Sequence, residues 1–357
     1  MKILLYIDEN RLAWGWQLIQ LIEALERKGV HSHVVCKSGG DFAARLAREG
    51  MAHDLFDAPI AWLARSARGL ERIIDSIKPD IIHTRLSSAA RLGGYWAKVK
   101  NIPVVQSVDK FPKAHYHKNA DFLLPCSHAI KEHMLALGFS EQKMQVVFNA
   151  LDVERYQPLR HLRESKRNEL GLDGGQLLIM GAGRFVRWKG FDNLLRAYGE
   201  LLCRHPSAKR QTRLLLAGDG EEKSKLVRLI GSLNIEKNVI MPGFVKDVRP
   251  YMQASDIFVL PSKTPEPFGV VLLEAMASGL ACIATRGGGA LDMIIEHENG
   301  WFVDQDSVPS LSAALRRVTE DKDARVRIAA QAQKSASRFD VNQVATQIIS
   351  IYESLAR

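Results

Sequence analysis

The sequence Thr-Pro-Glu-Pro-Phe-Gly-Val-Val-Leu-Leu-Glu-Ala-Met-Ala-Ser-Gly occupies residues 264–279. Between Val270 and Ala277 the only polar residue is Glu274, and apolar residues occupy every face, so the pattern predicts a helix that is buried all round. An unpaired ionised carboxylate in a protein core costs several kcal/mol. We therefore expect Glu274 to be hydrogen-bonded by protein or ligand groups.

A second carboxylate, Glu266, precedes Glu274 in a loop flanked by prolines. Pro267 suits a helix entry and Gly279 a helix exit, so we expect the helix to begin near Phe268. The free backbone amides of a helix N-terminus attract anions. Two carboxylates and an anion-binding helix end are thus expected at one spot, although either carboxylate by itself is equally well explained as an ordinary loop or core glutamate.

The length, composition and charge of the chain limit the classes of protein to which it can belong. The 357 residues suit two domains, and 46% hydrophobic with 25% charged residues is typical of a globular protein. The net charge is +9, and residues 60–120 hold eleven Lys or Arg against four Asp or Glu. Such a surplus favours an anionic partner, either a phosphorylated glycan, a membrane surface or nucleic acid, but solvated helix faces explain it as well. Nucleic acid is the weakest option because no nucleic-acid-binding motif is present.

Membrane and redox signals are weak. No window approaches 18 uninterrupted apolar residues, and the apolar start of the chain runs straight into Asp8 and Glu9, which predicts a first strand and not a signal peptide or anchor. Four scattered cysteines lack metal-ligand spacing: Cys36, Cys126, Cys203 and Cys282. We expect reduced thiols in a cytoplasmic protein, with peripheral attachment to the inner face of the cytoplasmic membrane left open.

Short apolar runs that alternate with amphipathic stretches predict βα units on parallel sheets, an α/β fold. In the first half the expected strands are residues 3–7, 32–36, 81–83, 104–106, 122–124 and 145–148, and the expected helices are residues 17–27, 42–49, 61–77, 89–100 and 129–137. In the second half the expected strands are residues 176–180, 213–217, 239–245, 256–260, 281–284 and 300–303, followed by a final helix over residues 341–355.

Three motifs together resemble the retaining GT-B glycosyltransferases of the large family-four group, most strongly over residues 181–303. The first is the Glu-x7-Glu spacing of Glu266 and Glu274, and the second is Arg184-x4-Lys189. The third is residues 147–156, Val-Phe-Asn-Ala-Leu-Asp-Val-Glu-Arg-Tyr, which are similar to the family's Pro-Asn-Gly-Val-Asp-x-x-x-Phe hinge with Phe148 and Ala150 in place of Pro and Gly.

The resemblance implies a GT-B fold, two Rossmann-like domains that face each other across a cleft. The domains would be an acceptor-binding domain over residues 1–157, a nucleotide-sugar-binding domain over residues 158–338, and a C-terminal helix over residues 339–357 that crosses back to the first domain. It also implies site residues. The catalytic candidates are Glu266 for the donor sugar, Arg184 and Lys189 for the diphosphate, and Asp109. The donor-binding candidates are Glu274 for the ribose, Gly269, Val270, Phe268, Phe244 and Gly15.

Two departures from the family concern the first domain. Asp109 stands where the family commonly has a His that orients the donor sugar, and a carboxylate can accept bonds from sugar hydroxyls. Gly15 alone stands where related enzymes have a Gly pair, in a loop expected over residues 8–15, with Trp14 and Trp16 on the acceptor side. The acceptor-binding candidates are Trp16, His83, Lys110 and Lys113, with Arg85, His115 and His117 nearby, although for any one histidine an ordinary structural role explains it as well.

Other site chemistries are less well supported. Residues 181–183 lack the third Gly of a dinucleotide fingerprint, which argues against a Rossmann oxidoreductase. Asp304-Gln305-Asp306 has the Asp-x-Asp form of metal-dependent GT-A transferases, but it follows a strand where the family has a surface loop, so we interpret it as a turn and helix start. Three glycines, residues 287–289, form a turn that suits close approach of backbone to a ligand.

The expected function is transfer of a hexosyl group, with retention of configuration, from a UDP-linked sugar to a hydroxyl of a cell-envelope glycan, the lipopolysaccharide core. No cofactor and no metal ion are expected, and the expected partners are the nucleotide sugar, a glycan or glycolipid acceptor and an anionic membrane surface, not nucleic acid. The alternatives are a GT-B scaffold that binds a nucleotide sugar without turnover, and another GT-B enzyme such as a sugar-nucleotide epimerase or phosphorylase.

Overall fold

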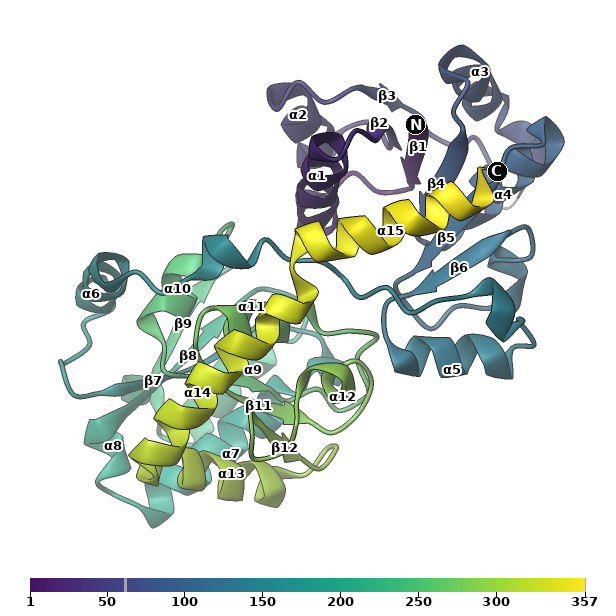
Figure 1. The fold of residues 1–357 in the computed structure, drawn as a ribbon. Coiled ribbons are helices and arrows are strands. Elements are labelled where there is room, and N and C mark those ends of the chain that lie inside the picture. The colour runs from purple at the N-terminus through teal and green to yellow at the C-terminus, as the bar shows by residue number, and fades with distance from the viewer. Residues whose placement is uncertain (61–62, 357) are drawn as a thin grey trace. The chain divides into compact units, whose positions relative to one another are not determined.

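A computed structural model describes residues 1–60 and 63–356, apart from the side chains of residues 12–15. The chain forms two compact units (Figure 1), the first comprising Met1–Asp152 with Phe339–Arg357 and the second Val153–Arg338. The sequence placed the first boundary after Gln157, whereas in the structure the second unit already begins at Val153. The C-terminal helix belongs to the first unit, and each unit is an α/β domain with one parallel sheet.

The first unit contains a six-stranded sheet in the order β3-β2-β1-β4-β5-β6. Its strands are β1 (Lys2–Ile7), β2 (His31–Cys36), β3 (His53–Leu55), β4 (Ile81–Arg85), β5 (Val104–Val108) and β6 (Phe122–Pro125). Its helices are α1 (Leu12–Arg27), α2 (Gly40–Arg48), α3 (Arg68–Ile77), α4 (Ser87–Lys100), α5 (His128–Ala136) and α15 (Val341–Leu355), with short 3-10 turns η1 (Ala64–Ser66), η2 (Ala114–Tyr116) and η3 (Glu141–Lys143).

Alternate residues of β1 face two separate cores in the first unit. Ile3 and Leu5 pack with α1, α2 and α15, whereas Leu4 and Tyr6 pack with α3 and α4. The strands of a parallel sheet that is covered on both faces are apolar throughout, and for this reason most of them could be predicted from the sequence. Figure 1 shows α15, in yellow, over this sheet.

Four expectations for the first unit differ from the structure or are incomplete. The strand β3 was not predicted because it has only three residues, none of them fully buried. Residues 145–148 do not form a strand, although the amides of Gln145 and Val147 donate to carbonyls of β6. Helix α1 begins at Leu12, so the loop after β1 is shorter than expected. The helix expected over residues 61–77 lies partly outside the described residues, and its described part is η1 followed by α3.

The second unit contains a sheet in the order β12-β11-β10-β7-β8-β9. Its strands are β7 (Leu177–Ala182), β8 (Thr212–Ala217), β9 (Val239–Gly243), β10 (Ile257–Leu260), β11 (Ala281–Thr285) and β12 (Trp301–Val303). Its helices are α6 (Arg160–Glu169), α7 (Phe191–Arg204), α8 (Ala208–Gln211), α9 (Lys223–Ser232), α10 (Arg249–Ala254), α11 (Val270–Ala277), α12 (Ala290–Met293), α13 (Val308–Glu320) and α14 (Lys322–Ala336), with 3-10 turns η4 (Val153–Tyr156), η5 (Arg187–Lys189), η6 (Glu236–Asn238) and η7 (Ser337–Phe339).

Strand order positions the candidate site. Because β10 lies between β7 and β11, the loops that follow these three strands meet at the carboxyl edge of the sheet, where open α/β folds bind ligands. Among the residues described, no helix is both long and apolar enough to span a membrane. The four cysteines are free thiols, and all except Cys203 are buried.

Candidate active site

The helix predicted from the opening motif is α11, and its burial is confirmed. Leu272, Leu273, Ala275 and Met276 are fully buried. The helix begins at Val270 and not near Phe268, because Gly269 adopts a left-handed conformation (φ 96°) that an α-helix cannot include. Phe268 is buried in the preceding loop. The amide of Val270 is therefore at the helix N-terminus, as an anion site requires.

The carboxylate of Glu274 has one hydrogen-bond donor among the described residues. The hydroxyl of Tyr156 donates to its Oε1 at 2.7 Å. The pKa of Glu274 is raised to about 7, mainly because the carboxylate is buried. The hydrogen bond from Tyr156 opposes this rise, Asp247 adds to it, and Arg249 opposes it. The expectation that this carboxylate would be hydrogen-bonded is met by a protein group, with capacity left on its second oxygen.

The carboxylate of Glu266 lies in a buried ion pair. The ammonium of Lys189 is 2.7 Å from its Oε1, and the hydroxyl of Ser262 donates to the same oxygen. The side chains of Lys189 and Glu266 are only 13% and 8% exposed. The structure therefore joins two residues for which we expected separate roles, and it adds Ser262.

Backbone packing brings Lys189 to this place. Gly190 follows Lys189 with φ 69°, and a Cβ there would clash with the carbonyl oxygen of Pro261. The amide of Lys263 donates to the carbonyl of Trp188 at 2.8 Å. The loop after β7 thus lies directly against the loop after β10, and only glycine allows that approach.

The glycine turn over residues 287–289 packs against the loop that carries Glu266. The amide of Gly289 donates to the carbonyl of Glu266 at 3.0 Å, and a Cβ on Gly288 (φ 59°) would clash with the same carbonyl oxygen. A Cβ on Gly289 would clash with the backbone of Phe268. The close approach that these glycines permit is to the loop that carries Glu266.

Asp306, the last residue of the Asp-x-Asp sequence, takes part in a second ion pair. The ammonium of Lys263 lies 2.9 Å from Asp192 and 3.1 Å from Asp306, and Asn193 donates to Asp306 at 2.8 Å. Hydrogen bonds from Asn193 and Lys263 lower the pKa of Asp306. Among the residues described, no group of three or more His, Cys, Asp or Glu side chains is arranged to hold a metal ion.

The remaining candidates of the second unit differ in exposure. Arg184 is exposed, and within the described part of the chain its side chain has no ion-pair partner. Phe244 is 68% exposed and follows Gly243, the end of β9. The two glutamates themselves do not share partners, because Glu274 contacts Tyr156 whereas Glu266 contacts Lys189.

In the first unit, Asp109 is paired with an arginine. Arg85 donates to both carboxylate oxygens of Asp109, at 2.7 and 3.1 Å, and to the side-chain oxygen of Asn149 at 2.9 Å. The side chain of Asp109 is 5% exposed. Arg85 at the end of β4 therefore neutralises the carboxylate that replaces the family's histidine.

His83, a candidate for contact with an acceptor, is fully buried. Its Nδ1 is 2.6 Å from the hydroxyl of Tyr352 and its Nε2 is 2.8 Å from the hydroxyl of Ser107. Burial, with Arg85 nearby, lowers the pKa of His83 to about 3, so the ring is neutral. Both ring nitrogens are occupied within the protein, which makes His83 a structural link between β4 and α15.

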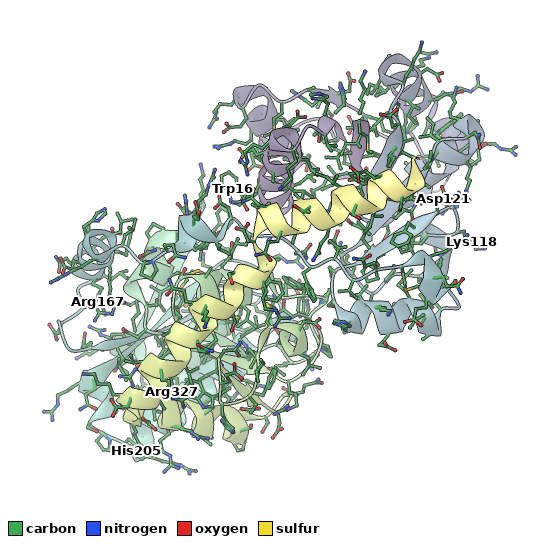
Figure 2. All side chains as sticks on the ribbon, in the orientation of Figure 1. Trp16, Lys118, Asp121, Arg167, His205 and Arg327 are labelled. Atoms are coloured by element: carbon green, nitrogen blue, oxygen red, sulfur yellow. The ribbon has the colours of Figure 1, made fainter. Side chains whose placement is uncertain are left out.

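Two candidates for the acceptor, Lys110 and Lys113, are exposed. Trp16 lies on α1 (Figure 2), with the guanidinium of Arg45 5.1 Å from its ring centre. Trp14 and Gly15 belong to residues 12–15, whose side chains lie outside the described part of the structure.

Sequence reasoning missed Ser262 and Tyr156 as partners of the two glutamates. Ser262 stands four residues before Glu266 and two residues after the end of β10, and a hydroxyl so close in the chain to a candidate site carboxylate is a usable signal. Tyr156 could have been suspected because it occupies the Phe position of the hinge motif and adds a hydroxyl.

Comparison with known proteins gives concordant results for both units. Residues 163–335 match the family described as glycosyl transferases group 1, and residues 15–155 match glycosyltransferase family 4. The chain is 26% identical to the lipopolysaccharide core biosynthesis glycosyltransferase LpsE of Rhizobium meliloti over 318 residues, which is 87% of this chain and 86% of that protein. It is 24% identical to LpsD of the same organism, over 94% of this chain and 93% of that protein.

Among solved structures, HepE from Anabaena in complex with UDP has the same fold. The TM-score is 0.87 at 23% identity, over 99% of this chain and all of that chain. A structure of HepE in complex with UDP-glucose matches with a TM-score of 0.86.

Proposed function

Because the chain is a GT-B glycosyltransferase of the family-four type, we propose that it transfers a hexosyl group from a UDP-sugar to a hydroxyl of a cell-envelope glycan with retention of anomeric configuration. The observation that carries this proposal is the buried Lys189–Glu266 pair at the carboxyl edge of the second sheet. A cation and a carboxylate held together beside a helix N-terminus suit a substrate that has both a diphosphate and a hydroxyl-rich sugar.

The chemistry of the site follows from where charge develops. Departure of a nucleoside diphosphate leaves negative charge on the leaving oxygen, which Lys189, Arg184 and the amide of Val270 can stabilise. Each well-placed donor of this kind contributes on the order of 3 kcal/mol. Glu266 can accept hydrogen bonds from sugar hydroxyls. We assign the role of covalent nucleophile to none of these residues, and we propose a front-face displacement assisted by the leaving phosphate.

The donor and acceptor classes are drawn from similar proteins. HepE binds UDP and UDP-glucose in its structures, and LpsE is named for lipopolysaccharide core biosynthesis. We accordingly propose a UDP-linked donor, bound by the second unit, and a lipopolysaccharide-core acceptor, bound by the first. The proposal requires neither a cofactor nor a metal ion, because the cations of the site are supplied by side chains.

We also propose that the first unit contacts an anionic membrane surface from a cytoplasmic location. Arg65, Arg68 and Arg72 are exposed on η1 and α3, beside Ile60 and Leu63, whose side chains are 38% and 39% exposed. Basic and apolar side chains on one segment are typical of proteins that bind anionic bilayers at their surface.

Vesicle sedimentation tests the membrane contact. Reversal of Arg65, Arg68 and Arg72 to Glu should abolish binding to anionic vesicles. The same reversal of three exposed cations of the second unit, Arg204, Lys209 and Arg210, should leave it unchanged. Equal binding of the wild type to neutral and anionic vesicles would remove this part of the proposal.

The nucleotide is tested by thermal unfolding of the wild type and Glu274→Ala with saturating UDP, GDP or ADP. A ligand at about a hundred times its Kd stabilises the native state by roughly 2.7 kcal/mol, which gives a visible shift in Tm. We expect a shift with UDP that the variant loses. A shift with GDP or ADP alone would show that the donor carries guanine or adenine and not uracil. No shift with any nucleotide would contradict the assignment of a nucleotide-sugar donor.

Turnover is tested by incubating the protein with UDP-sugars and lipopolysaccharide core, with the anomeric configuration of the product read by NMR. A product with inverted configuration would contradict the retaining mechanism. Nucleotide binding without transfer or donor hydrolysis would instead favour the non-catalytic scaffold. Arg184→Ala and Lys189→Ala should each lower turnover at least a hundredfold, and values within a few-fold of the wild type would refute the charge-stabilisation account.

A further inference from the structure

Tyr156 of the second unit has no role in the proposed function as described so far. It ends η4 and is only 3% exposed, and its hydroxyl donates to Oε1 of Glu274 at 2.7 Å. The hinge motif to which residues 147–156 are similar ends in Phe, whose ring cannot donate a hydrogen bond. The hydroxyl of Tyr156 therefore supplies a hydrogen bond that a Phe at this position could not.

The backbone around Tyr156 is held firmly by helix α10. Gln253, itself buried, donates through Nε2 to the carbonyl of Gln157 at 2.9 Å and accepts from the amide of Leu159 at 2.7 Å. On the other side, a Cβ on Gly279 would lie in contact with Pro158 at 3.4 Å. The tyrosine hydroxyl thus approaches Glu274 from a fixed position.

Glu274 has little other support in the protein. Within the described residues, Tyr156 provides its one side-chain hydrogen bond, and the charged groups that face it are Asp247 and Arg249 at the start of α10. Those two form an ion pair with each other at 2.7 Å. A buried carboxylate with a single donor retains capacity to accept further hydrogen bonds, which adjacent hydroxyl groups of a ligand can supply.

We propose that Tyr156 is a positioning residue that fixes Oε1 of Glu274 and directs Oε2 toward the vicinal hydroxyl groups of the donor's ribose. The inference rests on the proposed function, because it assumes that Glu274 faces a nucleotide. It goes beyond that function in naming a residue that the family motif does not supply and in predicting how nucleotide affinity depends on pH.

The pH dependence follows from charge. Ribose hydroxyls donate hydrogen bonds more strongly to an ionised carboxylate than to a neutral one. Affinity should therefore rise as pH increases through the pKa of Glu274, about 7. The hydroxyl of Tyr156 stabilises the ionised form, so its removal moves the rise in affinity to higher pH.

The test is the UDP affinity of wild type, Tyr156→Phe and Glu274→Gln, measured by calorimetry from pH 6 to pH 9. Tyr156→Phe keeps the ring and removes the hydroxyl. Loss of the bond raises the carboxyl pKa, so the variant should bind UDP several-fold more weakly at pH 7 and within about twofold of the wild type at pH 9. Glu274→Gln shows the pH dependence that the nucleotide itself contributes, and it should lack the additional rise.

Tyr198→Phe is the matched control, because Tyr198 is another buried tyrosine of the same unit whose hydroxyl bonds Thr212. It should lose some thermal stability without moving the pH midpoint of binding. UDP binding that is the same in Tyr156→Phe and wild type at every pH overturns the inference and leaves the proposed function intact. A uniform loss of affinity across pH also overturns it, since that indicates a packing defect. A wild type that binds none of UDP, GDP and ADP contradicts both proposals.

Discussion

The ammonium of Lys189 lies 2.7 Å from Oε1 of Glu266, although 77 residues separate the two in the chain. Removing one member of a buried ion pair leaves the other charge uncompensated, which typically costs 3–5 kcal/mol. Lys189→Met should therefore both destabilise the second unit by about that amount and lower kcat/KM at least a hundredfold. The double variant Lys189→Met/Glu266→Gln should recover most of the stability and none of the activity, as measured by urea unfolding and sugar-transfer assays.

Recovered activity in the double variant would show that the pair has only a structural role. The control is Lys225→Met, which removes a lysine of an exposed pair with Glu222. Exposed pairs of this kind contribute about 1 kcal/mol or less, so neither stability nor turnover should change much.

Glu274 should make the protein less stable at neutral pH. Its pKa rises from 4.5 to about 7 on folding, so the native state binds more protons than the unfolded state in that interval. Stability is therefore lost as pH increases from 4.5 to 7, and the penalty is complete above pH 7. Glu274→Gln should raise stability by about 3 kcal/mol at pH 8 and by much less at pH 5. Thermal unfolding at the two pH values checks this, and an equal gain at both would contradict the ionisation argument.

Lys263 should hold the loop that carries Glu266 through its contacts with Asp192 and Asp306. Lys263→Met frees this loop, and we expect kcat/KM to fall about tenfold, a loss of about 1.4 kcal/mol in transition-state stabilisation. Asp306→Asn should have a smaller effect because Asp192 still pairs with the lysine. Steady-state kinetics on both variants gives the change in kcat/KM. Lys263→Arg, which keeps the positive charge, should keep most of the activity. A larger loss in Asp306→Asn than in Lys263→Met would refute the arrangement.

Gly288 cannot accept a side chain without moving the loop of Glu266. Its φ is 59°, and a Cβ would clash with the carbonyl oxygen of Glu266. Gly288→Ala should destabilise the second unit by more than about 2 kcal/mol, whereas Gly174→Ala, at a site with open space and no positive φ, should have a neutral or slightly favourable effect. Chemical denaturation compares the two, and similar stabilities would disprove the steric argument.

The hydroxyl of Tyr352 joins the C-terminal helix α15 to β4 through His83. Tyr352→Phe leaves a buried imidazole nitrogen without its partner and should cost about 1–3 kcal/mol in unfolding free energy. Tyr95→Phe is the control, because among the described residues the hydroxyl of Tyr95 has no hydrogen-bond partner. Equal stabilities in urea would show that α15 is held by apolar packing alone.

The sequence by itself determined the local features of this protein. Alternation of apolar and amphipathic segments identified nearly every strand, since parallel strands buried on both faces are apolar throughout. The all-round apolar pattern of residues 270–277 identified α11, and the motif spacing singled out Arg184, Lys189, Glu266 and Glu274. These patterns involve residues that are close together in the chain, so they can be recognised without knowledge of the fold.

Only the tertiary structure decided which charged group meets which. The order β12-β11-β10-β7 brings the loops of Lys189, Glu266 and Gly288 together, and no local pattern encodes that order. The same holds for Tyr156 with Glu274 and for Arg85 with Asp109. The sequence indicated Asp109 as a free carboxylate of the site, whereas in the structure Arg85 neutralises its charge. His83 shows the converse, because its position at a strand end suggested a ligand contact while burial made it structural. Partner choice depends on contacts between residues far apart in the chain, and the energy of a charge depends on those partners and on its burial.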